Sequence, residues 1–285
     1  MIITKLQGGL GNQMFQYAIA RAIAEKNNNV FKLDLSFFPV QSLRSYELNR
    51  FHIVENIADQ SEVKRIAGSN GLFTKALRKL WVINRPVTYY PEQDITRFDE
   101  GVFDYKNNIY LDGYWQNEHY FLDIRQQICK EFSPVKPLSE QAQKLFELVQ
   151  SSNSVSLHVR RGDYVTNQAT NAVHGTCNLD YYKKAIGYIK QQVDNPMFFV
   201  FSDDIDWCKQ ELAFIPDKVF IDCTVSAIED LELMKHCQHN IIANSSFSWW
   251  GAWLNQHDKK IVVAPKSWFA ADPNKTLAVN NWIKL

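Results

Sequence analysis

The chain has 285 residues, of which 46% are hydrophobic and 22% are charged, with 31 basic and 31 acidic side chains. This composition is typical of a globular protein with a packed core, and the length suits one large domain or two ordinary ones. Because the charges balance, no overall electrostatic field favours nucleic acid, and we expect no nucleic-acid partner.

Several other classes of protein are also disfavoured. No run of 18 apolar residues occurs, so we expect no membrane-spanning helix, and Met1–Leu6 is too short an apolar start for a signal peptide. The cysteines are odd in number, scattered and without a Cys-x-x-Cys pair, which indicates reduced thiols in a cytoplasmic protein. They are Cys129, Cys177, Cys208, Cys223 and Cys237.

The chain opens with a predicted strand over residues 2–6, a glycine-rich turn and a predicted helix over residues 14–26. Dinucleotide-type folds often open in this way, because backbone without Cβ approaches a phosphate or sugar closely. The spacing is not Gly-x-Gly-x-x-Gly, which disfavours an NAD site. Asn12 is a candidate ligand-binding residue, and capping of the helix is its alternative role.

An irregular region follows the second predicted strand, at residues 30–34, and contains predicted helices near 59–67 and 72–81. The latter is basic and amphipathic, a pattern that suits an anionic membrane surface but more often marks a solvated helix, which we favour. A strand is predicted within 109–116 and a helix over 118–130.

The second half alternates strands and helices regularly, after a proline-containing linker near residues 133–137 and a helix that ends near residue 149. Repeated βα units predict an α/β fold with a parallel, doubly wound sheet. We therefore divide the chain into two domains, 1–145 and 146–285.

An apolar strand in the second half ends abruptly in charged residues. Val155, Leu157 and Val159 alternate along the strand, and Arg160 and Arg161 follow it directly. Open α/β sheets place ligands at the carboxyl ends of their strands, and guanidinium groups suit phosphate oxygens. The pattern favours a site for a nucleotide diphosphate, although an Arg-Arg pair can also be solvated surface charge.

Other polar residues follow neighbouring strands. Asn244, Ser245 and Ser246 begin a predicted helix, where unbonded N–H groups favour an anion. Asp230, in a helix that is otherwise apolar on one side, could accept paired donors from a guanine edge or could simply be an N-terminal helix charge. Asp203 and Asp204 could hold a metal ion or cap a helix, and we favour no metal.

Three motifs together resemble the α-1,2-fucosyltransferase family, glycosyltransferase family 11. They are Gly8-Gly9-Leu10-Gly11-Asn12-Gln13-Met14-Phe15-Gln16-Tyr17, His158-Val159-Arg160-Arg161-Gly162-Asp163-Tyr164 and Asn244-Ser245-Ser246-Phe247-Ser248-Trp249-Trp250-Gly251-Ala252-Trp253-Leu254. The resemblance implies a GT-B architecture of two Rossmann-like domains facing a cleft. Domain 1–145 would be the acceptor side with an irregular insert, and domain 146–285 would bind GDP-fucose.

The resemblance also implies a reaction. L-fucose would move from GDP-β-L-fucose to O2 of a β-galactoside with inversion, giving an α-1,2 linkage without a metal or other cofactor. The implied donor-binding residues are Gly11, Asn12, His158, Arg160, Asp230, Asn244, Ser245 and Ser246. Within this set, Arg160 would bind the β-phosphate, His158 the nucleotide and Asp230 the guanine.

Two residues are the candidate catalytic groups. Arg160 would stabilise charge on the departing phosphate, and Asp163 would take the proton of the acceptor hydroxyl. The alternatives for Asp163 are an ion pair with Arg161, or a phosphate oxygen acting as the base in its place.

Rival functions are a metal-dependent transferase that uses Asp203 and Asp204, a non-catalytic sugar- or nucleotide-binding protein on the same fold, and an O-fucosyltransferase acting on protein. From the family we expect a cytoplasmic enzyme, loosely held at the inner membrane, whose partners are GDP-fucose and a galactose-terminated glycan.

Overall fold

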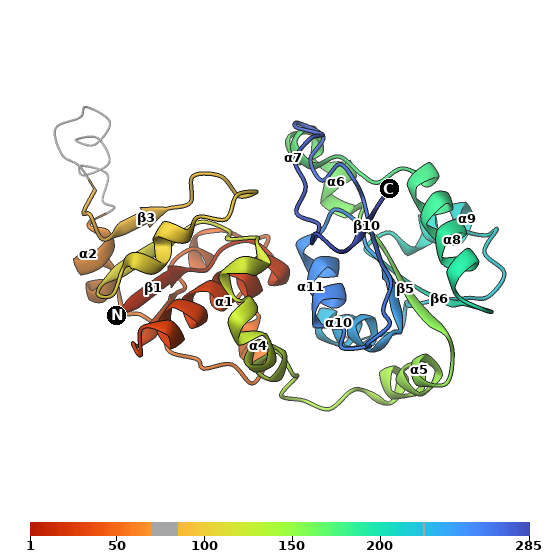
Figure 1. Cartoon of the computed structure of the whole chain (residues 1–285), viewed down its shortest axis with the longest axis horizontal. Helices are drawn as coiled ribbons and strands as arrows, with labels where there is room; N and C mark the ends of the chain where they lie inside the picture. Colours follow the sequence, from red (N-terminus) through yellow and green to blue (C-terminus); the bar gives the residue numbers. More distant parts are fainter. Residues whose placement is uncertain (70–84, 225) are drawn as a thin grey trace. The chain divides into compact units, whose positions relative to one another are not determined.

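The computed structural model describes residues 1–69, 85–224 and 226–285. The chain divides into two compact units, Met1–Ser133 and Pro134–Leu285 (Figure 1). Each unit contains its own parallel sheet with helices packed against it, so each is an α/β unit.

The division between the units falls after Ser133, in the predicted linker, whereas the sequence places it at 145/146. Helix α5 (Glu140–Gln150) belongs to the second unit because its apolar face, including Val149, packs on that unit's sheet and on α10 (Ala227–His236). The predicted basic helix at 72–81 lies outside the described residues.

The first unit contains a four-stranded sheet in the order β2-β1-β4-β3, and all its strand pairs are parallel. Each crossover therefore needs a connection over a face of the sheet. The elements are β1 (Ile2–Lys5), α1 (Leu10–Lys26), β2 (Phe31–Asp34), α2 (Gln60–Ala67), β3 (Tyr89–Pro91), β4 (Ile109–Asp112) and α4 (Arg125–Glu131), with short 3₁₀ turns at Phe38–Val40, Leu48–Arg50, Glu100–Asp104, Glu118–Tyr120 and Leu122–Ile124.

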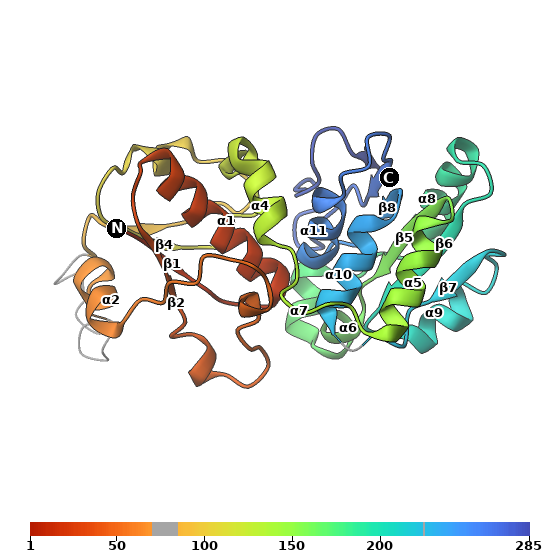
Figure 2. The same cartoon turned by 90° about the horizontal axis from the view of Figure 1, so that it is seen from below.

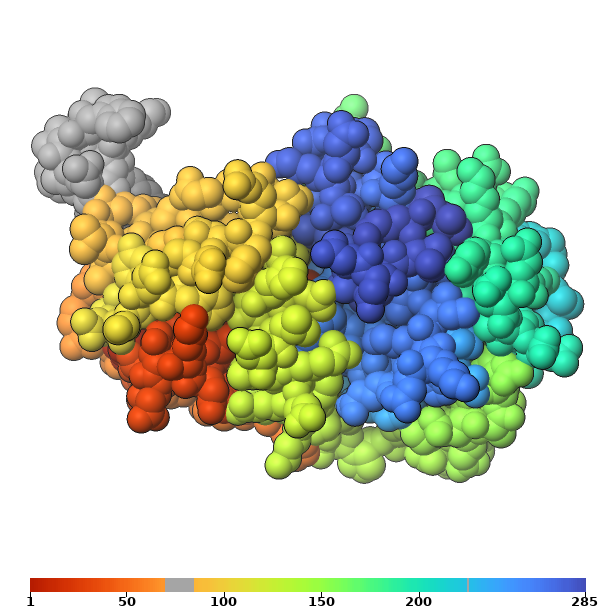
Figure 3. Space-filling model, in the orientation of Figure 1, coloured from red at the N-terminus to blue at the C-terminus, as the bar shows by residue number. Residues whose placement is uncertain are grey.

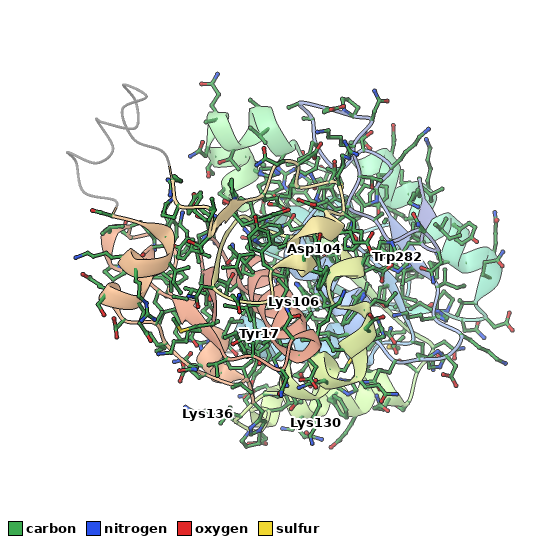
Figure 4. All side chains as sticks on the ribbon, turned by 60° about the vertical axis from the view of Figure 1, so that its left-hand side comes forward. Tyr17, Asp104, Lys106, Lys130, Lys136 and Trp282 are labelled. Atoms are coloured by element: carbon green, nitrogen blue, oxygen red, sulfur yellow. The ribbon has the colours of Figure 1, made fainter. Side chains whose placement is uncertain are left out.

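Helix α1 is the buried centre of the first unit. Tyr17, labelled in Figure 4, is fully buried and donates a hydrogen bond of 2.6 Å to Glu131 Oε2. Arg21 Nε donates to the other oxygen of Glu131 at 3.1 Å. Because buried polar groups are costly unless they are bonded, this network specifies how α4 packs on α1.

The second unit contains a six-stranded sheet in the order β10-β9-β8-β5-β6-β7, again with every pair parallel. Its strands are β5 (Ser154–Val159), β6 (Met197–Ser202), β7 (Lys218–Phe220), β8 (His239–Ile241), β9 (Val262–Ala264) and β10 (Ile283–Lys284). Besides α5 and α10, its helices are α6 (Gly162–Thr166), α7 (Gln168–His174), α8 (Leu179–Gln192), α9 (Ile205–Glu211) and α11 (Ser246–Leu254).

Helices cover both faces of this sheet, with α8 and α9 on one side and α10 and α11 on the other (Figure 1). Figure 2 shows α5 beside α10 on the second side. The alternation of side chains along a strand explains the layers. In β6, Phe198 and Val200 pack with α8 and α9, whereas Phe199 and Phe201 pack with α5 and α10.

Strand β5 has two different faces. Val155, Leu157 and Val159 join the apolar core under α8, as their alternation predicts. The intervening Ser156 faces the other layer, where its hydroxyl accepts a hydrogen bond of 2.7 Å from Asn240 Nδ2. Serine is small enough to leave room for the helices that lie on that face.

The tryptophans of α11 form part of the core of the second unit. Trp249, Trp250 and Trp253 are at most 1% exposed, and Trp249 Nε1 donates to the carbonyl of Leu277 at 2.8 Å. Trp282 packs on Trp249 with 5.6 Å between ring centroids. The C-terminal segment, dark blue in Figure 3, thus packs against α11. Because the indole rings of α11 are buried, they are unavailable for stacking on a sugar.

The second sheet has one point at which the order of the strands reverses, between β5 and β8. In the first sheet β1 and β4 are the two central strands, with β2 and β3 at the edges. Ligands of open α/β sheets bind beyond the carboxyl ends of such strands. Within the three described ranges, no helix combines the length and apolar character needed to cross a membrane.

Candidate functional site

The charged residues that follow β5 and β6 pair with one another. The two strands run in parallel register to their last residues, so Arg160 and Arg161 leave β5 level with Asp203 and Asp204 beyond β6. Arg160 Nη1 lies 2.7 Å from Asp203 Oδ2, and Arg161 Nε lies 2.9 Å from Asp204 Oδ2. The register of the strands therefore explains the pairing.

Arg160 is held by a second carboxylate. Its Nη2 forms an ion pair with Asp163, in the first turn of α6. Arg161, the alternative ion-pair partner for Asp163, forms an ion pair with Asp204. A guanidinium group has five N–H donors, so Arg160 can bind both carboxylates and still donate to a ligand.

Gly162 provides the space for this arrangement. A Cβ at this position would clash with the carboxylate of Asp203. That carboxylate also accepts a hydrogen bond of 2.8 Å from the backbone N–H of Arg161. Asp203 thus orients both the turn and the side chain of Arg160.

His158 lies one residue inside the end of β5 and is 6% exposed. Burial, with a smaller effect of the nearby Arg160 charge, lowers its pKa to about 3, so the imidazole is neutral at physiological pH. Its Nδ1 has no hydrogen-bond partner among the described residues. A neutral ring with an unpaired nitrogen can donate to or accept from a ligand, depending on its tautomer.

The residues beyond β8 have two separate tasks. Asn244 Nδ2 donates to the carbonyls of His174, Gly175 and Trp268 at 2.9, 3.2 and 3.2 Å. Asn244 therefore links the segment at His174 and Gly175 to the segment at Trp268. Ser245 is the N-cap of α11, and its hydroxyl accepts from the N–H of Phe247 at 3.3 Å, while Ser246 begins the helix.

Tyr164 is a neighbour of Arg160 that the sequence did not single out. Its ring centroid lies 5.2 Å from Arg160 Cζ, and its ring also stacks on His174 with 4.9 Å between the ring centroids. The Tyr164 hydroxyl donates to the carbonyl of Asn244 at 3.3 Å. It thus links α6 to the strand on the far side of the switch point.

Asp230 lies in the first turn of α10, which begins at the carboxyl edge because it follows β7. Its carboxylate accepts a hydrogen bond of 2.7 Å from Thr224 Oγ1. Burial raises the pKa of Asp230 to about 6, although the Thr224 bond acts in the opposite direction. The structure thus places Asp230 on the same edge of the sheet as Arg160, two strands away.

The first unit brings a second group of motif residues to the carboxyl end of β1. Gly8 has a φ of +79°, and Gly9 is the N-cap of α1, whose first turn contains the buried Gly11. Asn12 does not cap the helix, so that alternative is wrong. Instead its Oδ1 accepts a hydrogen bond of 2.7 Å from Gln116 Nε2, a residue that the sequence did not indicate.

Both residues of the proposed metal-binding pair are engaged by arginines. Asp203 is bound to Arg160 and Asp204 to Arg161. Asp204 also caps α9, where its Oδ1 accepts from the N–H of Trp207 at 3.3 Å. In the part of the chain that the structure describes, no three His, Cys, Asp or Glu side chains are grouped to hold a metal ion.

Comparison with known proteins identifies the family. The family model described as Glycosyl transferase family 11 matches residues 1–285. The chain belongs to this family. It is therefore a glycosyltransferase, and the resemblance of the three motifs is confirmed.

Relatives in this family share much of the chain. An α-1,2-colitosyltransferase of Escherichia coli is 36% identical over 274 residues, covering 94% of this chain and 92% of the relative. The O-antigen biosynthesis glycosyltransferase WbnK of Escherichia coli is 35% identical, covering 98% and 99%. The galactoside 2-α-L-fucosyltransferase Sec1 of mouse is 28% identical, covering 90% of this chain and 65% of the relative.

A solved structure supports the fold. The NodZ α-1,6-fucosyltransferase of Bradyrhizobium, crystallised with GDP, aligns with a TM-score of 0.54 at 17% identity, covering 88% of this chain and 90% of that one. The predicted α/β fold of GT-B type, with a parallel sheet in each of two units, is confirmed.

Replacing Gly162 tests the packing of the arginine–carboxylate cluster. Gly162→Ala drives a Cβ into Asp203, and we expect the free energy of unfolding to fall by ~1–3 kcal/mol through loss of charge-assisted bonds. Gly187→Ala in α8 is the matched control, because no atom lies within 4 Å of its added Cβ. Alanine there should stabilise the helix by ~0.5–1 kcal/mol, measured by urea denaturation. Equal effects at the two positions would contradict the packing role of Gly162.

Proposed function

We propose that this protein is an inverting galactoside α-1,2-fucosyltransferase, which transfers L-fucose from GDP-β-L-fucose to O2 of galactose in a glycan. The observation that carries the proposal is the family match over the whole chain, to a family whose relatives are named for α-1,2 transfer and for transfer to galactosides. The position of Arg160 at the switch point of the second sheet supports a diphosphate site there.

The reaction is a single displacement. The bond between fucose C1 and the β-phosphate oxygen breaks as O2 of galactose bonds to C1 from the opposite face, and GDP leaves. Negative charge grows on the β-phosphate, where Arg160 and the N–H groups at the start of α11 stabilise it. Because Asp163 and Asp203 already orient Arg160, little reorganisation is needed during the reaction.

The carboxylates of Asp163 and Asp203 also compete with the diphosphate of GDP-fucose for Arg160. The cluster of Arg160, Arg161, Asp163, Asp203 and Asp204 has two positive and three negative charges, and so is not net positive. We propose that the β-phosphate takes the N–H groups now bound to Asp163. The carboxylate released in this way is available to accept the proton of O2, and this links donor binding to base catalysis.

No metal is needed in this mechanism. The diphosphate charge is met by Arg160 and by a helix N-terminus, and the two carboxylates suited to a metal are bound to Arg160 and Arg161. We therefore propose metal-independent transfer without a cofactor. The metal-dependent rival requires Asp203 and Asp204 to release both arginines.

The proposed acceptor is a galactose-terminated glycan. Similarity to a relative named for O-antigen biosynthesis supports a bacterial surface polysaccharide as the acceptor. We propose that the enzyme works in the cytoplasm at the inner membrane, where a lipid-linked glycan would be presented to it. Co-sedimentation with anionic vesicles tests this location.

A second candidate differs only in the sugar that is transferred. The relative with 36% identity is an α-1,2-colitosyltransferase, which favours colitose as an alternative donor sugar with the same linkage. The nucleotide site and the mechanism would be unchanged.

Transfer assays with the two donors test the function. We expect the protein to transfer fucose from GDP-fucose to a β-galactoside in the presence of EDTA, and we expect Arg160→Ala to lower kcat/KM by ~10²–10³. Product linkage is read by NMR. Arg50→Ala, at an exposed arginine, is the control and should retain activity. Faster transfer of colitose would favour the second candidate, and restoration of activity only by a metal would favour the metal-dependent rival.

Asp163→Asn separates the two roles of this carboxylate. If the carboxylate takes the O2 proton, kcat falls by ~10²–10⁴. The affinity for GDP-fucose should hold or rise, because a competitor for Arg160 has lost its charge. Calorimetry and steady-state kinetics provide the two values. A kcat within tenfold of that of the unmodified protein would instead assign the proton to a phosphate oxygen.

The pKa of Asp230 predicts how donor affinity depends on pH. The N–H groups of guanine bind best to an ionised carboxylate, and the pKa of Asp230 is raised to about 6. Affinity for GDP-fucose should therefore rise between about pH 5 and 7 and then level off. GDP-fucose is the suitable ligand because its substituted diphosphate lacks the terminal ionisation near pH 6. Asp230→Asn should bind GDP-fucose weakly and with an affinity that does not depend on pH in this range. Asp258→Asn, at an exposed position, is the control and should retain the pH dependence. A pH-independent affinity of the unmodified protein would exclude Asp230 as the residue that binds guanine.

A further inference from the structure

The segment that follows β4 in the first unit adopts an unusual conformation. Trp115 has a φ of +59°, a left-handed conformation that a bulky side chain rarely adopts, and its side chain is fully buried. Strained backbone of this kind persists only where the surroundings enforce it, and it gathers at functional sites. The strained residue lies at the carboxyl end of β4, one strand from the glycine turn that follows β1.

Glu92 enforces this conformation. One carboxylate oxygen accepts from the N–H of Tyr114 at 2.7 Å and the other accepts from the N–H of Trp115 at 2.9 Å. A Cβ on Gly113 would clash with Glu92, so glycine is required there. Gln16 Nε2, on α1, donates to the carbonyl of Gly113 at 3.1 Å and fixes the other side of the turn.

The turn places the side chain of Gln116 beside Asn12 in the glycine-rich turn that follows β1. Gln116 is 8% exposed, and its Nε2 donates to Asn12 Oδ1 at 2.7 Å. This bond occupies the acceptor atom of Asn12 and leaves the Nδ2 group as the donor. Nδ2 lies over Gly8, within 2.5 Å of the place where a Cβ would stand, so the glycine makes room for it.

We propose that Gln116 is a positioning residue for sugar transfer, which sets the amide of Asn12 as a hydrogen-bond donor to an oxygen of a sugar substrate at the carboxyl edge of the first unit's sheet. Glu92 acts one step further back, by holding the turn that carries Gln116. The inference rests on the proposed function and deepens it, because it assigns an atom and a direction of donation to Asn12. A carboxamide fixed in this way binds an oxygen that accepts a hydrogen bond, such as a sugar hydroxyl oxygen, and does not bind a hydrogen-bond donor.

A double-mutant cycle tests the inference. If Gln116 acts through Asn12, Asn12→Ala should lower kcat/KM for fucose transfer about 100-fold and Gln116→Ala about tenfold, the range for leaving a buried polar group without its hydrogen-bond partner. Gln116→Ala should add less than a twofold loss to Asn12→Ala, because coupled residues are not additive. Gln126→Ala, at an exposed glutamine of α4, is the matched control and should retain activity.

Conservative variants add a readout that a merely structural role would not move. Asn12→Asp can still accept from Gln116 but offers no donor, so we expect native thermal stability together with a loss as large as that of Asn12→Ala. Gln116→Glu cannot donate to Asn12 Oδ1, and we expect its activity to fall at least as far as that of Gln116→Ala. GDP binding, measured by calorimetry, should persist in every variant and show that the second unit is intact.

The inference and the proposed function fail in different ways. Additive losses in the cycle, or full activity of Asn12→Asp, in a protein that transfers fucose would overturn the inference alone. An unmodified protein that transfers neither fucose nor colitose to any galactoside would overturn the proposed function, and with it the inference that rests on it.

Discussion

The ion pairs of Arg160 with Asp163 and Asp203 are the interaction on which the second unit's site depends. They connect the ends of β5 and β6 with the first turn of α6 and set the direction of a guanidinium group before any ligand arrives. A flexible arginine would lose conformational entropy on binding phosphate, whereas this one has already lost it during folding. The cost is competition, because two carboxylates neutralise the cation that a diphosphate would need.

The first unit solves a related problem with neutral groups. Asn12 is oriented by Gln116, which is oriented by a turn that Glu92 holds. In both units a carboxylate orients a hydrogen-bond donor: Asp163 and Asp203 orient Arg160, and Glu92 holds the turn that positions Gln116. In each unit the candidate site residues are thus fixed by neighbours from adjacent strand ends, which the parallel sheet brings to one edge.

Much of the fold follows from patterns that are local in the sequence. The alternation in β5 and the apolar run of β6 predict two covered faces, and the structure has them. The predicted helix at 118–130 is broken into two 3₁₀ turns and α4, because Asn117 caps the first turn and the chain bends at Phe121. The charged turn after Arg161 is helical from Gly162, a start that no capping residue announces.

The partners of the site residues could not be predicted in the same way. Gln116 and Asn12 are 104 positions apart, and only the order of the strands makes them neighbours. Asp203 follows its strand as visibly as Arg160 follows β5, but the sequence does not say that the two strands are adjacent and in register. For the same reason Asp203 and Asp204 resemble a metal-binding pair in the sequence, because the sequence does not show that Arg160 and Arg161 already bind them.

One consequence concerns how such enzymes can diversify. Arg160, His158, Asp230 and Ser245 all lie within Pro134–Leu285, on one sheet whose core is its own. The proposed nucleotide-binding residues therefore form a module that can be inherited intact while the other half of the chain changes. Chimaeras joined after Ser133 would exchange the first unit between family members and leave these residues and their sheet unchanged.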